Sequence, residues 1–235
     1  MRVRTLLALL AVSACAALGL AACGGDDDDS ASATPAPAQT SGSGNMAMSE
    51  ADTMTPAADL RVALDTLLGE HALLAVAATQ KGLDDAEDFE AAAAALDANS
   101  VEVSEAIASV YGDEAAEQFL DAPSLWRDHI RFFVDYTVAL AGDDKAGQQE
   151  AVDNLIGYTG AFSGFLAQAT GLPQDALQEG VTTHVMQLKG ALDAYAKGNY
   201  EKAQSLAREA YKHMIATGDT LAEGIVAQNP DMFAR

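Results

Sequence analysis

The chain is poor in cysteine and in basic residues. Only two of its 235 residues are cysteine, Cys15 and Cys23, and both lie near the N-terminus. The rest of the chain therefore has no thiol for a disulfide or a cysteine metal site. Lys and Arg number 13 against 35 Asp and Glu, which gives a net charge of -22. Nucleic acid binding needs clustered Lys and Arg, so we expect no nucleic acid partner.

The motifs of common enzyme classes are also missing. The sequence has no Gly-rich phosphate loop, no cysteine nucleophile in its body and no Gly-x-Ser-x-Gly turn after a strand. Its paired carboxylates, such as Asp84 with Asp85, lie in charge runs that are typical of solvated surface. The sequence therefore favours a protein that is not an enzyme, and we predict no catalytic residue.

Residues 1–22 have the pattern of a bacterial lipoprotein signal peptide. Two arginines precede an uncharged apolar run, and Leu20-Ala21-Ala22-Cys23 follows as a lipobox. The alternative site at Cys15 would leave too short an apolar run before the cut. A plain secretory signal with an incidental cysteine is the other interpretation. We predict lipid on Cys23, which anchors the protein to the cell membrane on its extracytoplasmic side.

Residues 23–58 have the composition of a tether. An aspartate run, Asp26 to Asp29, is followed by a stretch rich in Ser, Ala, Pro and Gly. Such a segment cannot bury enough apolar surface to offset the entropy lost on ordering. Met46, Met48 and Met54 lie close together near its end, and their thioethers are ligands that suit Cu(I).

Residues 59–235 have a helical pattern throughout. Gly, Asp, Asn and Pro residues separate six Ala- and Leu-rich segments, which span residues 60–80, 86–111, 114–141, 144–170, 173–197 and 199–228. Because the connections are short, we predict an all-α, up-down antiparallel bundle of about six helices. Residues 121–124 should break the third helix after its first turns. The segment 144–170 contains three glycines at short spacing, Gly157, Gly160 and Gly164. Because glycine has no side chain, we predict that a neighbouring helix packs closely against this segment.

The bundle sequence also shows an internal repeat. Three positions recur at a constant offset of 59, namely Ser104, Ala108 and Gly112 against Ser163, Ala167 and Gly171. In the helices that follow, His129 matches His184 at an offset of 55. The difference of four residues corresponds to an insertion at 121–124.

Four histidines, one in each of four predicted helices, lie on the apolar stripes: His71, His129, His184 and His213. Each stands near the middle of its helix at three-and-four spacing from leucines or other apolar residues, so each should point into the bundle. Helix midpoints share one level in an up-down bundle. We therefore predict that the four rings converge, as a site for copper or zinc.

The alternative is a buried polar network in which the histidines bond tyrosine, threonine or carboxylate groups and fix the helix register. A di-iron carboxylate site is not expected, because no Glu lies three residues before any of the histidines. Glu70 and Asp128 adjoin two histidines, but neighbours on a helix point about 100° apart. Those two carboxylates should support the site or face solvent rather than bind the same metal.

Several segments resemble a family of secreted bacterial helical proteins. They are residues 60–71 (Leu-Arg-Val-Ala-Leu-Asp-Thr-Leu-Leu-Gly-Glu-His), 125–130 (Leu-Trp-Arg-Asp-His-Ile), 213–219 and 224–233. The resemblance covers most of 59–233 and implies a helical bundle of unknown activity. Some members of the family carry the label "copper amine oxidase", through similar domains joined to a non-catalytic N-terminal module.

The residues do not fit amine oxidation. That enzyme class forms its quinone from a tyrosine in an Asn-Tyr-Asp/Glu setting, which Asn199-Tyr200-Glu201 matches. However, the Thr expected three residues before the Asn is Ala196, and the His-x-His copper motif is missing. The catalytic domain of those enzymes is also a β-sandwich. Asn199 is explained more simply as a helix cap.

Overall fold

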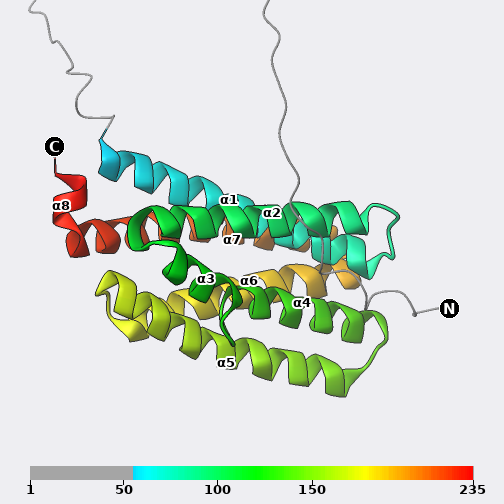
Figure 1. The fold of residues 1–235 in the computed structure, drawn as a ribbon. Coiled ribbons are helices and arrows are strands. Elements are labelled where there is room, and N and C mark those ends of the chain that lie inside the picture. The colour runs from blue at the N-terminus through cyan, green and yellow to red at the C-terminus, as the bar shows by residue number, and fades with distance from the viewer. Residues whose placement is uncertain (1–54, 235) are drawn as a thin grey trace, which may run out of the picture. The chain divides into compact units, whose positions relative to one another are not determined.

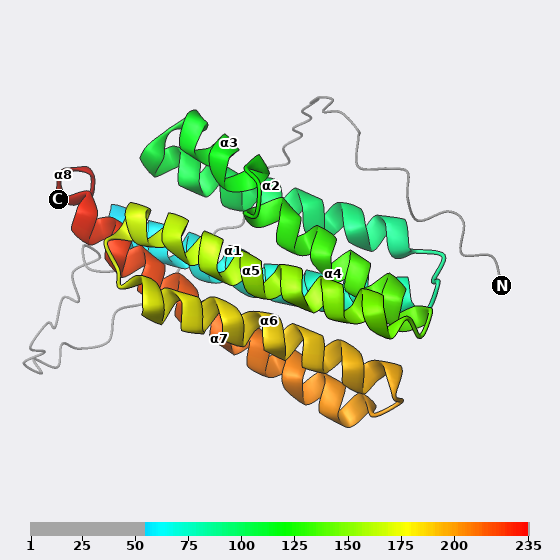
Figure 2. The same cartoon turned by 90° about the horizontal axis from the view of Figure 1, so that it is seen from below.

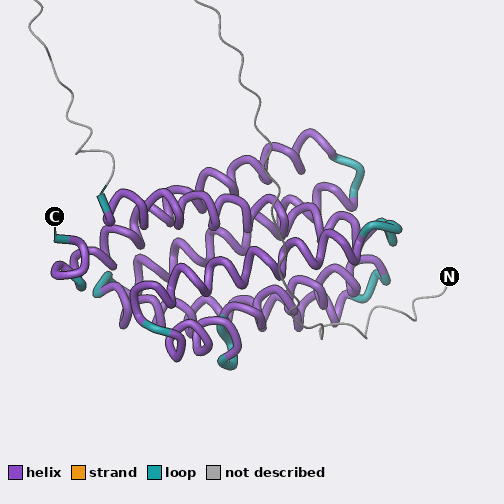
Figure 3. The backbone as a smooth tube through the Cα atoms, turned by 45° about the horizontal axis from the view of Figure 1, so that its top comes forward, coloured by secondary structure: helices purple, strands orange, loops and turns teal. Residues whose placement is uncertain are grey.

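A computed structural model of the chain describes residues 55–234. Over this part the chain is helical, with short loops at the two ends of the bundle and one, between residues 121 and 126, partway along it (Figures 1 and 3). The helices are α1 (Pro56–Leu83), α2 (Phe89–Tyr111), α3 (Asp113–Asp121), α4 (Trp126–Ala141), α5 (Lys145–Thr170), α6 (Gln174–Ala196), α7 (Tyr200–Gln228) and α8 (Pro230–Phe233). The predicted all-α fold is confirmed. The predictions for Cys23 and for Met46, Met48 and Met54 concern residues outside this range.

The helix starts follow from capping chemistry. The Thr55 side chain accepts a hydrogen bond from the Ala58 amide at 3.1 Å, so α1 begins earlier than the sequence pattern indicated. The Asn199 side chain accepts from the Lys202 amide at 3.2 Å, which confirms its predicted role as the cap of α7. Pro173 stands one residue before α6 rather than in its first turn.

The predicted break at residues 121–124 is confirmed, and it divides one expected helix into α3 and α4. Ala122 is extended, as a residue before proline prefers, and Ser124 has a positive φ of 61°. The Asp128 side chain then accepts from the Ser124 amide at 2.7 Å and closes the first turn of α4. As a result α4 begins partway along the bundle rather than at its end (Figure 1).

The long helices run up and down in alternation, as predicted (Figure 1). Four of them form a closed ring in which α1 packs on α4, α4 on α5, α5 on α6, and α6 on α1. Helix α7 packs along α1 and α6 more extensively than these two helices pack on each other, and it also reaches α5, so it closes that side of the bundle, whereas α2 packs along α1 and α3 (Figure 2). The histidine-bearing helices therefore do not occupy equivalent positions.

Helix α1 is the most central element, because it packs against α2, α4, α6 and α7. Among the described residues it is the one helix whose length and apolar composition would suit a membrane span. In this fold many of its apolar side chains belong to the core, whereas Val62 and Leu73 are exposed. The buried ones are Leu60, Leu64, Leu68, Ala72, Ala75 and Ala78.

Helices α1 and α7 approach each other closely at Gly218. A Cβ added to Gly218 would lie 2.8 Å from the backbone nitrogen of Asp65 and 2.9 Å from its Cα. The predicted close approach at the α5 glycines is wrong. A Cβ on Gly157 would have nothing within 4 Å, and one on Gly160 would meet only the end of a glutamine side chain at 3.6 Å. Small residues in a helix do not reveal which of its faces is packed.

We predict opposite effects of alanine at two of these glycines. Gly218→Ala should lower the free energy of unfolding by about 1–3 kcal/mol, because its methyl group collides with the α1 backbone. Gly157→Ala should raise it by about 0.5–1 kcal/mol, because alanine restricts the unfolded chain and meets open space. Urea unfolding of both variants measures the difference, and equal effects would contradict the close α1–α7 approach.

Candidate functional site

The structure brings three of the four predicted histidines together inside the ring of helices. His71 comes from α1, His129 from α4 and His184 from α6, and their exposed fractions are 1%, 1% and 5%. The Nε2 atoms of His71 and His129 are 3.2 Å apart. The ring centroids of His71 and His184 are 5.7 Å apart. We refer to these three side chains as the histidine cluster.

The fourth histidine, His213, is held differently. It lies on α7 and is only partly buried. Its Nε2 donates to the backbone carbonyl of Gly180 at 2.8 Å. The four predicted histidines thus line one cavity, and His213 is near enough to His184 to lower its pKa, but ring contacts join only His71, His129 and His184.

The hydrogen bonds of the histidine cluster fix where its protons lie. The His129 Nδ1 contacts the Trp126 carbonyl oxygen, which can only accept, so that nitrogen carries the proton. In an uncharged His129 the Nε2 then has a lone pair, and the His71 Nε2–H donates to it. The His71 Nδ1 is left as an acceptor, and it has no hydrogen-bond partner among residues 55–234.

Burial keeps these imidazoles uncharged. Desolvation lowers the pKa of His129 to about 4, and the bond to the Trp126 carbonyl only partly offsets it. Desolvation, together with repulsion from His129 and His213, lowers the pKa of His184 to about 3. The same desolvation, with His129 and His184 nearby, lowers the pKa of His71 well below its usual range. At neutral pH all three have a lone pair to offer to a metal or a proton donor.

Aromatic side chains surround the cluster. The Trp126 ring centroid lies 4.6 Å from that of His71, and the Tyr158 ring stacks on His129 at 4.8 Å. Burial raises the pKa of Tyr158 well above its usual range, so the phenol stays neutral. The sequence predicts tyrosines only as hydrogen-bond partners of the histidines, whereas Tyr158 contacts His129 through its ring. Its place on the inner face of α5, opposite α4, could have been found only by knowing which helices are neighbours.

The histidines line a cavity of about 500 Å³ inside the bundle. Its walls come from α1 to α7, and all four histidines contribute to them. About half of the lining is leucine, isoleucine, valine, phenylalanine, tyrosine and tryptophan, and within residues 55–234 no Asp, Glu, Lys or Arg lines it. This volume and lining are typical of sites for small molecules.

The carboxylates next to the cluster are engaged elsewhere. Glu70 accepts from the Asn99 side chain at 3.1 Å, and Asp128 accepts from the Ser124 amide. Among residues 55–234, no group of three or more His, Cys, Asp or Glu side chains is arranged to hold a metal ion. A metal site in this cavity would therefore be built on two imidazole ligands before any third ligand joined them.

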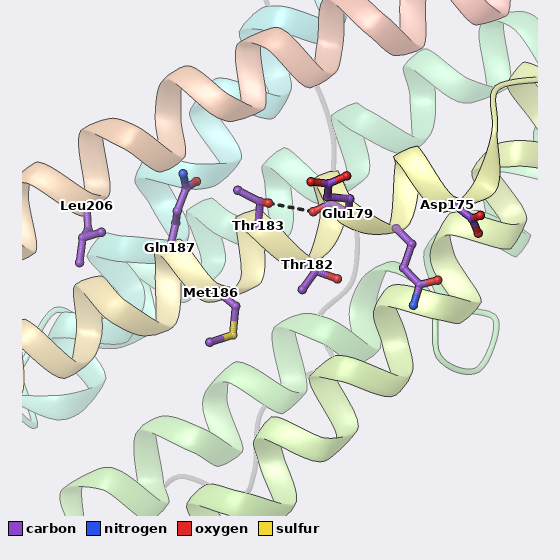
Figure 4. Close-up of a pocket in the computed structure, with 8 residues that line it drawn as sticks. Asp175, Glu179, Thr182, Thr183, Met186, Gln187 and Leu206 are labelled. Atoms are coloured by element: carbon purple, nitrogen blue, oxygen red, sulfur yellow. Dashed lines mark hydrogen bonds between the residues drawn. The ribbon is translucent and has the colours of Figure 1, made fainter.

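Other sequence candidates lie away from the cluster. Tyr200, in the tripeptide that matches a quinone precursor, is 60% exposed at the start of α7. A second hollow, of about 530 Å³, lies on the outer face of α6, near Thr183 and Met186 (Figure 4). The Thr183 hydroxyl there donates to the Glu179 carbonyl at 2.8 Å (Figure 4). That hydrogen bond follows the helix itself and requires no ligand.

We predict that stability falls with acidification in a way that depends on the cluster. The folded pKa values of the histidines lie below the ordinary value of about 6.5 expected for the unfolded chain. Between about pH 6.5 and 4 the unfolded state therefore binds protons that the folded state excludes. The free energy of unfolding should fall by about 1.4 kcal/mol per pH unit for each such histidine.

Urea unfolding at pH 7.5, 6.0 and 5.0 measures this slope. His184→Phe should reduce the slope by one histidine's share, because the unfolded variant has one fewer site to protonate. Val101→Ala, at an exposed position on α2, is the matched control and should keep the original slope. An unchanged slope in His184→Phe would show that His184 is not buried uncharged.

Comparison with family models, with curated proteins and with solved structures gave no match to this chain. The role of the cavity and its histidines has to be inferred from their own geometry and chemistry. The features available for that purpose are a close imidazole pair, a third uncharged imidazole and an uncharged wall.

Proposed function

We propose that this chain is a lipid-anchored, extracytoplasmic binding protein whose helical domain holds copper or zinc through His71 and His129. The observation that carries the metal site is the distance of 3.2 Å between their Nε2 atoms. Two nitrogens bound to one tetrahedral zinc at 2.0–2.1 Å lie about 3.3–3.4 Å apart. The imidazole pair is thus already spaced close to what one metal ion requires.

The proton arrangement also supports metal binding. One proton, on the His71 Nε2, lies between the two nitrogens. For a metal to bind both Nε2 atoms, this single N–H proton of His71 would have to move to Nδ1, which frees the Nε2 lone pair and keeps the ring neutral. The His129 Nδ1 bond to the Trp126 carbonyl is the kind of support that orients metal-binding histidines. Neutral imidazoles bind without first having to lose a proton to solvent at pH 7.

His184 is the candidate for a third ligand. Its ring neighbours His71, and neither of its nitrogens has a hydrogen-bond partner within residues 55–234. A buried polar group without a partner is costly, by about 1–3 kcal/mol. A metal that recruited His184 would recover part of that cost, whereas His213 already has a partner in the Gly180 carbonyl.

A packing network is the second candidate role, and a specific observation favours it. Hydrogen bonds run from His71 to His129 and from His129 to the Trp126 carbonyl, and so they tie α1 to the start of α4. Such a chain fixes the register of two helices without any ligand. It leaves His184 unexplained, since that ring takes no part in it.

We predict that metal binding depends on the pair and not on His213. Untagged protein titrated with Zn(II), or with Cu(I) under reducing conditions, should bind one equivalent. His71→Phe and His129→Phe should each weaken binding by more than about a hundredfold, because one imidazole cannot hold the ion alone. His213→Phe, the matched control, should bind as the unaltered chain does, because its Nε2 is held by Gly180.

Metal analysis after dialysis gives the stoichiometry, and thermal unfolding gives a second measure. A bound metal should raise the melting temperature in proportion to the logarithm of its free concentration. If the unaltered chain remains empty in both titrations, the packing network is the correct role. If all four histidine variants lose metal equally, the site includes His213 and the geometric assignment is wrong.

The anchor is tested separately. Cys23→Ser should move the protein from the membrane fraction to the soluble fraction, because the acidic chain has no basic surface to hold it at a membrane. Fractionation of bacteria that express each form, followed by mass spectrometry of the N-terminal peptide, measures this change. Retention of Cys23→Ser in the membrane fraction would contradict lipid anchoring at this residue.

A further inference from the structure

The cavity extends well beyond the histidine cluster, toward the end of the bundle where α2 and α5 finish and α6 begins. Along α7 its wall runs from His213 to Ile225, which corresponds to about 18 Å of helix. Thr170 and Tyr111 line its far part, and the Tyr111 hydroxyl donates to the Ala169 carbonyl at 2.7 Å there. We call this extension the apolar arm.

The apolar arm exists because α4 is short. Helix α4 has 16 residues, about 24 Å of length, whereas its neighbour α5 has 26, about 39 Å. The missing part of the ring is covered by α3, whose Phe119 and Ala115 line the cavity. The Ser104 hydroxyl holds α3 in place by donating to the Ala116 carbonyl at 3.1 Å. The side chains of α3 cover this gap but leave open space beneath them, and that space is the apolar arm.

The lining of the apolar arm excludes a charged organic occupant. Among residues 55–234, no Asp, Glu, Lys or Arg side chain lines the cavity. An organic ion in the arm, away from the histidine pair, would lose its hydration without gaining a partner of opposite charge. Apolar side chains dominate, including Phe162 and Phe165 from α5. The occupant that this wall fits is neutral and mostly hydrocarbon.

Unsatisfied polar atoms lie at one end only. Both nitrogens of His184 and the Trp126 Nε1 are buried and have no hydrogen-bond partner among the described residues. An uncharged imidazole can accept a hydrogen bond, and the indole N–H can only donate. A hydroxyl group both donates and accepts, so it can pair with either kind of atom.

We propose that the cavity binds a neutral alkylphenol-like molecule, with its hydroxyl group at His184 and its hydrocarbon tail in the apolar arm. A phenol ring fits among the aromatic side chains around the cluster, and a tail of several carbons follows α7 toward Ile225. The proposal does not require a metal at His71 and His129, because it uses His184, whose two nitrogens form no hydrogen bond with either of those histidines.

Binding can be followed from inside the cavity. Trp126 is the single tryptophan of the chain and part of the wall, so its fluorescence reports occupancy directly. The full chain carrying Cys23→Ser, kept in EDTA, allows the titration without detergent or metal. The probe is 4-hexylphenol, compared with 4-hexylanisole, which cannot donate a hydrogen bond, and with 4-hexylbenzoate, which is charged.

The expected order is phenol first, anisole weaker and benzoate weakest. The anisole should bind about three- to tenfold more weakly, which is the net value of one hydrogen bond. The benzoate should bind at least a hundredfold more weakly, because its charge would be buried without a partner. Absence of phenol binding, or equal binding of all three probes, would overturn the proposal.

Variants test the orientation. His184→Phe should bring the phenol down to the affinity of the anisole, and His184→Gln, which keeps an acceptor, should restore part of the preference. Ile107→Phe, in the apolar arm, should weaken phenol and anisole alike by filling space. Val101→Ala, exposed on the same helix, is the control and should change neither. A phenol preference unchanged in His184→Phe would place the hydroxyl elsewhere.

The two proposals fail in distinguishable ways. If the phenol binds in EDTA, and the chain takes up no metal in the separate zinc and copper titrations, this inference stands and the metal site is refuted. Metal uptake without phenol binding would refute this inference alone. Binding of the anisole as tightly as the phenol would show an apolar cavity in which His184 has no role.

Discussion

Everything at the centre of this bundle depends on keeping three imidazoles uncharged in an apolar interior. Desolvation favours the neutral form of His71, His129 and His184, and no charged side chain lines the cavity beside them. Because the rings are neutral, they can bond one another, a carbonyl or a ligand through directed lone pairs. Within residues 55–234 the charged side chains lie outside the cavity, so the cavity wall is uncharged although the chain as a whole is strongly acidic.

The site and the cavity have a common structural origin. The break at residues 121–124 starts α4 at Trp126, which places His129 in its first turn and the Trp126 carbonyl within reach of that ring. The same break turns α3 aside, so that one side of the ring is covered by Phe119 instead of by a continuous helix. One short break between two helices therefore both orients a histidine and leaves room next to it.

Much of this could be predicted from the sequence, because helix faces and breaks are local properties. The apolar stripes placed His71, His129 and His184 inside, and Pro123 marked the break in the third helix. Which helices are neighbours is a tertiary property, and single-helix patterns do not contain it. For that reason the helical pattern could not show that His213 bonds the Gly180 carbonyl of α6 rather than another histidine. For the same reason the cavity was not expected, and the close approach was assigned to Gly157 instead of Gly218.

The pairing of α1 with α7 has a consequence for the order in which the fold can form. The first long helix touches the last one closely, at Asp65 and Gly218, which are separated by most of the domain. Contacts between such distant segments form late, and a growing chain meets them only when its end has been made. Until then α1, whose length and apolar composition would suit a membrane span, lacks its main partner. During synthesis, the apolar face of a long helix thus stays uncovered until the last long helix has been made.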